Sequence, residues 1–183
     1  MEAIGETGQM AVGQERPIGE VYNGFTYFAD GDVVVAKITP CFENGKGALA
    51  AGLINGVGFG TTELHVMRAL PDVAPRWLLY LTQTHTFRKL GEAEMYGAGG
   101  QKRVPEDFIK DHRIALPDLE EQEHIANFLD WKTGQIDALI DKKVGLSGTL
   151  KGLDLLAEYR SALITAAVTG QIDVRGVAVP SAA

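Results

Sequence analysis

Residues 116–170 carry helical signals from end to end, and this stretch is the strongest constraint on the fold. Asp118 follows Pro117 and precedes Glu121 by three positions, so each acidic side chain can accept a hydrogen bond from the other residue's backbone N–H. Gly170 stands at the far end, where a left-handed residue commonly closes a helix. The sequence therefore predicts helix from the proline to the glycine.

Apolar residues within this stretch recur at steps of three, four or seven, the spacing of helices that pair with another helix. They are Leu129, Ile136, Leu139, Leu146, Leu150, Leu153, Ala157, Ile164 and Ala167. Two arrangements fit: a hairpin that bends at Gly145 to Gly148 and packs on itself, or one extended helix that pairs with a partner. We expect the extended helix, because the apolar seam keeps its phase across the glycines.

Composition limits the other possibilities. Cys41 is the single cysteine among 183 residues, so the chain has no internal disulfide and no cysteine cluster for zinc. The four histidines are scattered, and we predict neither a metal site nor a cofactor. No segment approaches the roughly 18 consecutive apolar residues of a membrane span, so we expect a cytoplasmic protein without membrane contact.

The formal net charge of -7 is unusual for a protein that binds nucleic acid, because such proteins generally carry a basic surface. The stretch 76–113 is the local exception, with seven Lys or Arg residues against five Asp or Glu residues. Any face that contacts DNA should therefore include this stretch.

The first half of the chain is β-rich. We predict a strand at 32–38, a return strand at 48–54 after the turn at Asn44 and Gly45, and a third strand at 62–70 after a glycine-rich loop. From Pro75 to Gly91 the apolar spacing becomes helical. A short helix from Pro105 and a brief strand at 114–116 complete an α+β domain before the long helix.

Six motifs carry a family likeness in their order along the chain. They are GDVVVAKITPCFENGKGALA, GFGTTELHV, GGQKRVPEDF, LPDLEEQEHIANFLD, IDALI and EYRSALITAAVTGQIDVR. Together they resemble the target recognition domain and the following conserved helix of type I restriction-modification specificity subunits. The likeness covers roughly residues 30–175, and the combination is more specific than any one motif.

The resemblance implies two recognition domains in a full subunit, each reading half of a split site in double-stranded DNA. Two antiparallel conserved helices join them and dock methyltransferase (modification) subunits, and through these the restriction subunits. This chain carries one of each, so we expect a half-subunit or a truncated form. We divide it into an N-terminally incomplete recognition domain (1–116), a dimerisation and docking helix (117–170) and a tail (171–183).

Three groups of residues are candidates for DNA contact. Short polar side chains and lysines at a strand end and its turn suit phosphate and base-edge contacts. These are Lys37, Thr39, Asn44 and Lys46. Thr61 and Thr62 follow glycines that permit close approach to phosphate. In the loop 97–103, Gln101 can pair with adenine, Arg103 can pair with guanine, and Lys102 adds charge. The alternatives without a ligand are, in the same order, a solvated hairpin tip, a tight turn entering a strand and a flexible solvated turn.

The sequence contains little evidence of a catalytic site. Asp32, Glu43 and Lys46 could supply the carboxylates and lysine of a metal-dependent nuclease, but their spacing does not match such a site. We therefore expect a non-catalytic specificity subunit; the alternative is an assembly or regulatory fragment that acts through its helix without reading DNA. An unpaired helix would expose an apolar stripe, so we also expect a homodimer with antiparallel helices.

Overall fold

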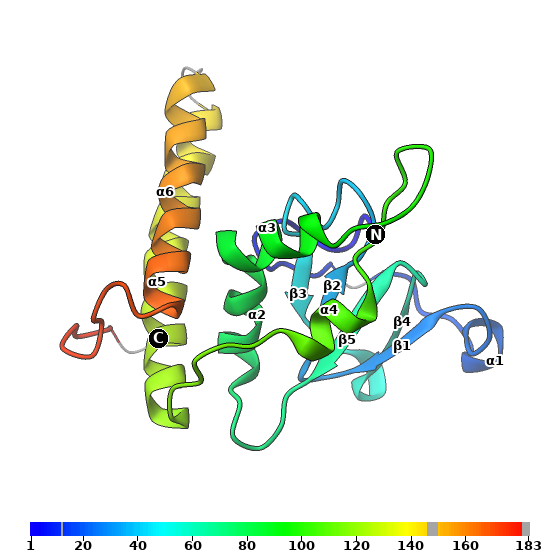
Figure 1. Cartoon of the computed structure of the whole chain (residues 1–183). Helices are drawn as coiled ribbons and strands as arrows, with labels where there is room; N and C mark the ends of the chain where they lie inside the picture. Colours follow the sequence, from blue (N-terminus) through cyan, green and yellow to red (C-terminus); the bar gives the residue numbers. More distant parts are fainter. Residues whose placement is uncertain (12, 146–149, 181–183) are drawn as a thin grey trace.

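The computed structural model describes residues 1–11, 13–145 and 150–180. Figure 1 shows a body of short strands and helices beside a column of long helices. This arrangement confirms the predicted α+β class, with the long helix α5 (Leu119–Gly145) following the mixed domain. None of the described helices combines the length and apolar character needed to cross a membrane.

The strand β2 (Asp32–Ala36) is the centre of the body, and all five of its residues are buried. It pairs antiparallel with β3 (Gly47–Leu49) on one side and with β5 (Leu64–Arg68) on the other. Val34 faces a cluster with Phe28, while Val33 and Val35 face another cluster with Phe42. Successive side chains point to opposite faces of a strand, so this valine run fills both cores. The three predicted strands are confirmed, with shorter bounds.

A second, two-stranded sheet joins β1 (Thr26–Ala29) to β4 (Val57–Gly60), next to the helix α1 (Ile18–Val21) and the turn η1 (Ile54–Gly56). The glycine-rich loop that we predicted before the third strand contains β4, so that prediction was wrong. A Cβ at Gly58 would lie 2.5 Å from the Phe28 ring. This glycine therefore serves close packing between paired strands rather than loop flexibility.

The helical stretch after Pro75 consists of two helices, α2 (Pro75–Gln83) and α3 (His85–Ala93). Thr84 ends the first and caps the second, because its Oγ1 accepts a hydrogen bond from the Phe87 N–H at 3.2 Å. The predicted short helix is α4 (Glu106–Asp111), whereas 114–116 form no strand.

The predicted single long helix is two helices, α5 and α6 (Leu150–Val168). They pack side by side in Figure 1 and run antiparallel, because Ile125 and Leu129 near the start of α5 share a cluster with Ile164 and Val168 near the end of α6. The expectation of an extended helix was therefore wrong, and the hairpin alternative is correct. Apolar residues of α5 therefore pack against α6 of the same chain. Residues 146–149, including the seam residue Leu146, lie outside the described part.

The predicted helix ends are confirmed. Asp118 Oδ1 accepts the Glu121 N–H at 2.8 Å, and Gly170 has a φ of 70° after α6. Other seam residues are divided by burial. Leu129, Ile136, Ile164 and Ala167 are buried, whereas Leu139 and Ala157 are exposed and Leu153 is half-buried. The hairpin thus covers only part of the seam.

Polar contacts fix the hairpin to the body. Gln122 is fully buried, its Oε1 accepts the Ala74 N–H at 2.8 Å, and its Nε2 donates to the carbonyls of Asp72 and Pro117. Trp77 on α2 belongs to the same buried cluster as α5 and α6. These contacts couple the hairpin to the body of strands and short helices.

Candidate nucleic-acid interface

Three distant segments meet at the end of β2. The Lys37 N–H donates to the Glu63 carbonyl at 3.0 Å, and the Lys37 carbonyl accepts the Val104 N–H at 2.9 Å. A backbone bridge also links Ile38 to Arg103. The predicted residues Lys37, Thr39, Thr61, Thr62, Gln101, Lys102 and Arg103 all belong to these three segments. We call this meeting point the β2 corner.

The loop 97–103 projects from the β2 corner, as the green loop after α3 in Figure 1 shows. Its base is closed by paired backbone hydrogen bonds, with the Arg103 N–H donating to the Tyr96 carbonyl at 2.9 Å and the reverse bond at 3.2 Å. Gly97, with a φ of 145°, turns where a Cβ would lie 2.4 Å from the Gln101 carbonyl oxygen. The loop is thus anchored at its base and exposed at its tip.

Thr39 joins the strand end to this loop. Its Oγ1 donates to the Lys102 carbonyl and accepts the Lys102 N–H, both at 2.9 Å. Because both polar functions of the Thr39 hydroxyl are used by the loop, its role in this structure is to position Lys102. The side chains of Gln101 and Lys102 remain exposed to solvent.

Arg103 is paired with Glu63, a residue that we did not predict as a contact. The Arg103 Nε lies 2.9 Å from Glu63 Oε2, and Nη2 lies 2.8 Å from Oε1. Hydrogen bonds from Arg103 lower the pKa of the Glu63 carboxyl, and the same bonds raise the pKa of Arg103. Arg103, which we predicted to pair with guanine, is therefore already paired with a carboxylate of the same chain.

The remaining predicted residues are distributed differently. Asn44 donates from Nδ2 to Glu6 Oε1 at 3.1 Å, which orients it toward the N-terminal segment. Lys46 lies beside Ala36, whose N–H donates to the Lys46 carbonyl at 2.9 Å. Thr61 Oγ1 accepts the Glu63 N–H at 3.3 Å, whereas Thr62 is exposed. The side chain of Asn44 is therefore hydrogen-bonded to the N-terminal segment and not to the β2 corner.

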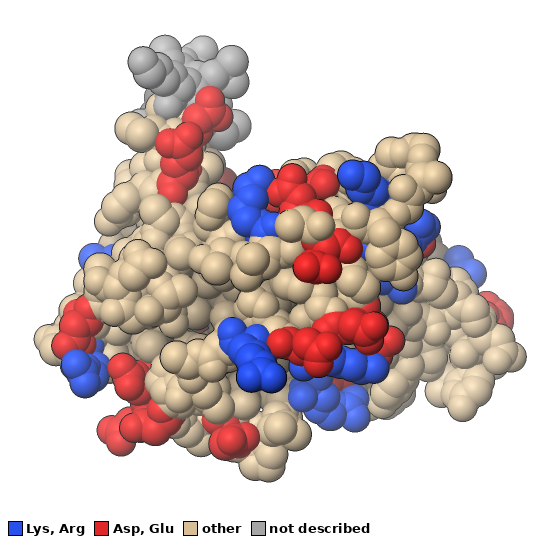
Figure 2. Space-filling view, viewed as in Figure 1, with Lys and Arg blue, Asp and Glu red and all other residues tan. Residues whose placement is uncertain are grey.

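The charge distribution is mixed. On the face drawn in Figure 2, Lys and Arg side chains are interspersed with Asp and Glu side chains. Among the described residues, basic side chains such as Lys89 and Lys110 are paired with carboxylates at 2.6 Å. Any nucleic-acid contact on this surface must therefore be local, as the composition indicated.

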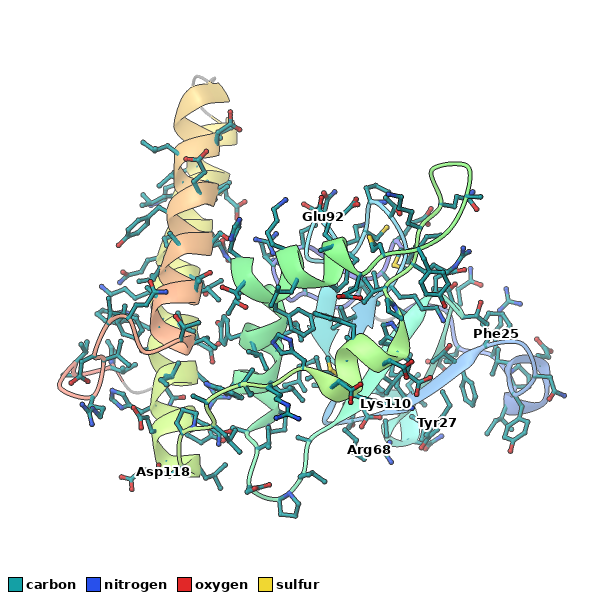
Figure 3. The ribbon with its side chains drawn as sticks, viewed as in Figure 1. Phe25, Tyr27, Arg68, Glu92, Lys110 and Asp118 are labelled. Carbon is teal, nitrogen blue, oxygen red and sulfur yellow. The ribbon has the colours of Figure 1, made fainter. Side chains whose placement is uncertain are left out.

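Exposed aromatic side chains lie on β1 and just before it, and they were not expected from the sequence. Phe25 and Tyr27 are about half exposed, and the Tyr27 ring meets the Phe59 ring edge-on at 5.6 Å. Figure 3 labels Tyr27 close to Arg68, with Phe25 farther along toward α1. Because Thr26 pairs with Gly60 in antiparallel strands, Phe25 lies close to Thr61, the first residue after β4.

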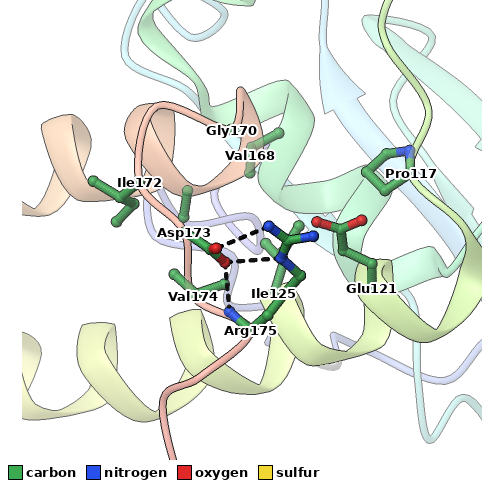
Figure 4. Close-up of a pocket in the computed structure, with 10 residues that line it drawn as sticks. Pro117, Glu121, Ile125, Val168, Gly170, Ile172, Asp173, Val174 and Arg175 are labelled. Carbon is green, nitrogen blue, oxygen red and sulfur yellow. Dashed lines mark hydrogen bonds and ion pairs between the residues drawn. The ribbon is translucent and has the colours of Figure 1, made fainter.

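The described part of the chain holds no group of three or more His, Cys, Asp or Glu residues placed for a metal ion. Asp32 is buried and accepts hydrogen bonds from Arg68 Nε and Nη2, both at 2.7 Å. A pocket of about 110 Å³ lies between α5, α6 and the tail, and Glu121 and Arg175 are among its lining residues. Figure 4 shows this pocket. None of the predicted DNA-contacting residues lines it.

Comparisons with known proteins agree on one family. The model described as "Type I restriction modification DNA specificity domain" matches residues 14–143. The specificity subunits of the type I restriction enzymes EcoAI and EcoEI, both from Escherichia coli, are 51% identical over 107 residues and 46% identical over 108 residues. In each case the match covers 58% of this chain and 18% of the relative, so this chain spans less than a fifth of those proteins.

A solved structure supports the fold. The crystal structure of the HsdS subunit from Thermoanaerobacter tengcongensis aligns with a TM-score of 0.57 and 23% sequence identity. The alignment covers 80% of this chain and 36% of that one.

Proposed function

Because this chain belongs to the type I restriction modification DNA specificity domain family, we propose that it reads one half of a split site in double-stranded DNA and docks methyltransferase subunits. In this proposal the chain itself is non-catalytic and binds no cofactor. Restriction subunits join through the methyltransferase subunits. The recognition domain supplies the sequence contacts, and the helices supply the assembly contacts.

The β2 corner is the observation that carries the DNA-reading part. Three segments up to 67 positions apart bring Lys37, Lys102 and the exposed Thr62 to one edge, beside a loop that projects into solvent. Lysines position a protein on the phosphate backbone, and an exposed loop can reach base edges in a groove. A solvated turn would not need the reciprocal Thr39–Lys102 hydrogen bonds that fix the loop's base.

The helical hairpin supports the assembly part. Leu155, Tyr159 and Ala162 are exposed at steps of four and three on α6, so they lie on one stripe of the helix. Leu139 is also exposed on α5. Exposed apolar stripes of this kind mark contact surfaces. We propose that this surface binds methyltransferase subunits or a second copy of the chain, which gives a homodimer of hairpins rather than of single helices.

The competing proposal is an assembly or regulatory fragment that no longer reads DNA. The net charge of -7 and the mixed charges in Figure 2 favour it. Both proposals predict co-purification with modification subunits, and only the first predicts sequence-directed methylation.

The discriminating experiment is to express the chain with a modification subunit from its own system and map the methylated positions in host DNA. A bipartite motif that disappears when Lys37 and Lys102 are both changed to Ala supports DNA reading. Capture of the modification subunit without any methylated motif supports the assembly fragment. A matched control is Lys142→Ala, which removes one exposed lysine on α5.

A further inference from the structure

We propose that Glu63 is a positioning residue that aims Arg103 at a guanine, so that the half-site contains a guanine read in the major groove by this pair. The inference rests on the proposed DNA-reading function and deepens it. It assigns a role to Glu63 and a base to one contact.

The geometry of the pair leaves one edge of the guanidinium available. Glu63 occupies the side edge, through Nε at 2.9 Å and Nη2 at 2.8 Å. The remaining contact is a long one of 3.5 Å from Nη1 to the Gln101 carbonyl. A guanidinium has a planar, fixed arrangement of donors, so fixing the side edge also fixes the end edge, where Nη1 and Nη2 each keep an N–H.

Both partners are held by backbone hydrogen bonds. Arg103 is paired through its N–H and carbonyl with Tyr96 across the base of the loop. The Glu63 carbonyl accepts the Lys37 N–H at 3.0 Å, and its own N–H donates to Thr61 Oγ1 at 3.3 Å. The guanidinium therefore has a defined direction before any ligand arrives, which reduces the entropy lost on binding.

The pair differs from two other arginine–carboxylate pairs, Arg68–Asp32 and Arg175–Asp173. Asp32 is buried and also accepts the Ala29 N–H at 2.8 Å, so its pair with Arg68 holds the β1–β2 turn. Asp173 and Arg175 are two residues apart and pair within the tail. Glu63 and Arg103 lie 40 residues apart at the β2 corner, with 25% and 41% of their side chains exposed.

The chemistry of the free edge matches guanine. In the major groove guanine presents N7 and O6 as adjacent acceptors, and two parallel N–H groups of arginine pair with them. Phosphate accepts from the same edge. The Glu63 carboxylate offsets much of the arginine charge, which weakens attraction to an anion but leaves the paired donors intact for a neutral base. The arrangement therefore favours base over phosphate.

The test begins with enrichment of a random duplex library by the full chain, alone or with its modification subunit. Four proteins are compared: the parent, Glu63→Gln, Arg103→Lys and the control Asp173→Asn, which makes the same acid-to-amide change at an arginine pair in the tail. The parent and the control should enrich one motif that contains guanine. In Glu63→Gln and Arg103→Lys, preference at one guanine position should fall about tenfold or more, with the other positions unchanged.

A second measurement uses the parent protein and does not depend on how the variants fold. Replacing that guanine with 7-deazaguanine removes the N7 acceptor and should weaken parent binding about tenfold, while the same replacement at other guanines has little effect.

The outcomes separate the inference from the proposed function. If an enriched motif persists unchanged in Arg103→Lys, or if both variants weaken every sequence equally, the pair contacts phosphate or serves the loop alone, and the inference is wrong while DNA reading stands. If 7-deazaguanine has no effect at any position, the guanine assignment is likewise overturned. If the parent enriches no sequence, the proposed function itself fails, and the inference fails with it.

Discussion

Arg160 on α6 donates a hydrogen bond from Nε to Asp137 Oδ1 on α5 at 3.0 Å. The arginine is buried, and its Nη2 also donates to the Thr7 carbonyl at 3.2 Å. One side chain therefore joins the two helices of the hairpin to the N-terminal segment. The contact holds the hairpin closed within a single chain and ties it to the recognition domain.

Changing Arg160 to Ala should lower the free energy of unfolding by about 1 to 3 kcal/mol, because Asp137 and the Thr7 carbonyl lose a charged donor in a partly buried site. Urea titration followed by circular dichroism measures the change. The control is Lys110→Ala, which breaks an exposed pair with Glu106 and should cost less than about 1 kcal/mol. Equal effects of the two changes would show that the buried contact does not hold the hairpin.

Changing Gln122 to Leu should cost about 2 to 4 kcal/mol of stability. The change leaves the Ala74 N–H and the carbonyls of Asp72 and Pro117 without partners at a fully buried position. Thermal or urea unfolding measures the loss. Gln135→Leu is the matched control, because it makes the same change at an exposed position of α5. A loss of similar size in the control would contradict the assigned role of Gln122.

Much of the body was predictable because the signals were local. The valine run at Val33 to Val35 and the cap at Asp118 each act through neighbouring residues, and the structure confirms them. The pairing of β1 with β4 was not predictable in this way. Gly58 looked like a flexible loop residue, whereas its lack of a side chain makes room for Phe28 from another strand.

The partner of a helix and the partner of a charged side chain were likewise not predictable from local sequence signals. An apolar seam has the same spacing whether its partner helix lies in the same chain or in another, so the sequence could not decide between Ile164 and a second copy as the partner of Leu129. The predicted residues near Lys37, Thr61 and Gln101 lie in segments that meet at the β2 corner, whereas Asn44 and Lys46 lie outside it. Glu63 was missed because its pairing with Arg103 depends on a fold that joins segments 40 residues apart.

Acid should destabilise the protein partly through Asp32. Hydrogen bonds from Arg68, above all, hold the pKa of this carboxyl below its usual value. A carboxyl whose pKa is lower in the folded state stabilises the protein above its unfolded pKa of about 4, and this contribution is lost as the pH falls through the folded value.

Asp32→Asn should therefore be less stable than the parent by about 1 to 2 kcal/mol at pH 7, and the difference should shrink below pH 4. Urea unfolding from pH 7 down to pH 3 measures it, with the exposed Asp111→Asn as control. A difference that stays constant over this range would show that the charge of Asp32 is not the cause.

Self-association should depend on the outer stripe of α6 rather than on the seam. Leu155 is 66% exposed and Tyr159 is 58% exposed, so changing both to Glu leaves the hairpin core intact and places charge on the proposed contact surface. Light scattering at micromolar concentration should show a dimer for the parent and a monomer for the variant. Glu158→Gln on the same helix should remain dimeric. A monomeric parent without modification subunits would contradict the homodimer proposal.

The central claim is that the β2 corner contacts DNA, and salt dependence of duplex binding tests it most directly. Each lost phosphate contact should reduce the slope of log affinity against log salt concentration by about 0.9. The measurement compares the parent with the double variant Lys37→Ala and Lys102→Ala, and with Lys142→Ala as control. The account predicts weaker binding and a slope reduced by about 1 to 2 in the double variant alone. Unchanged affinity and slope in the double variant would contradict it.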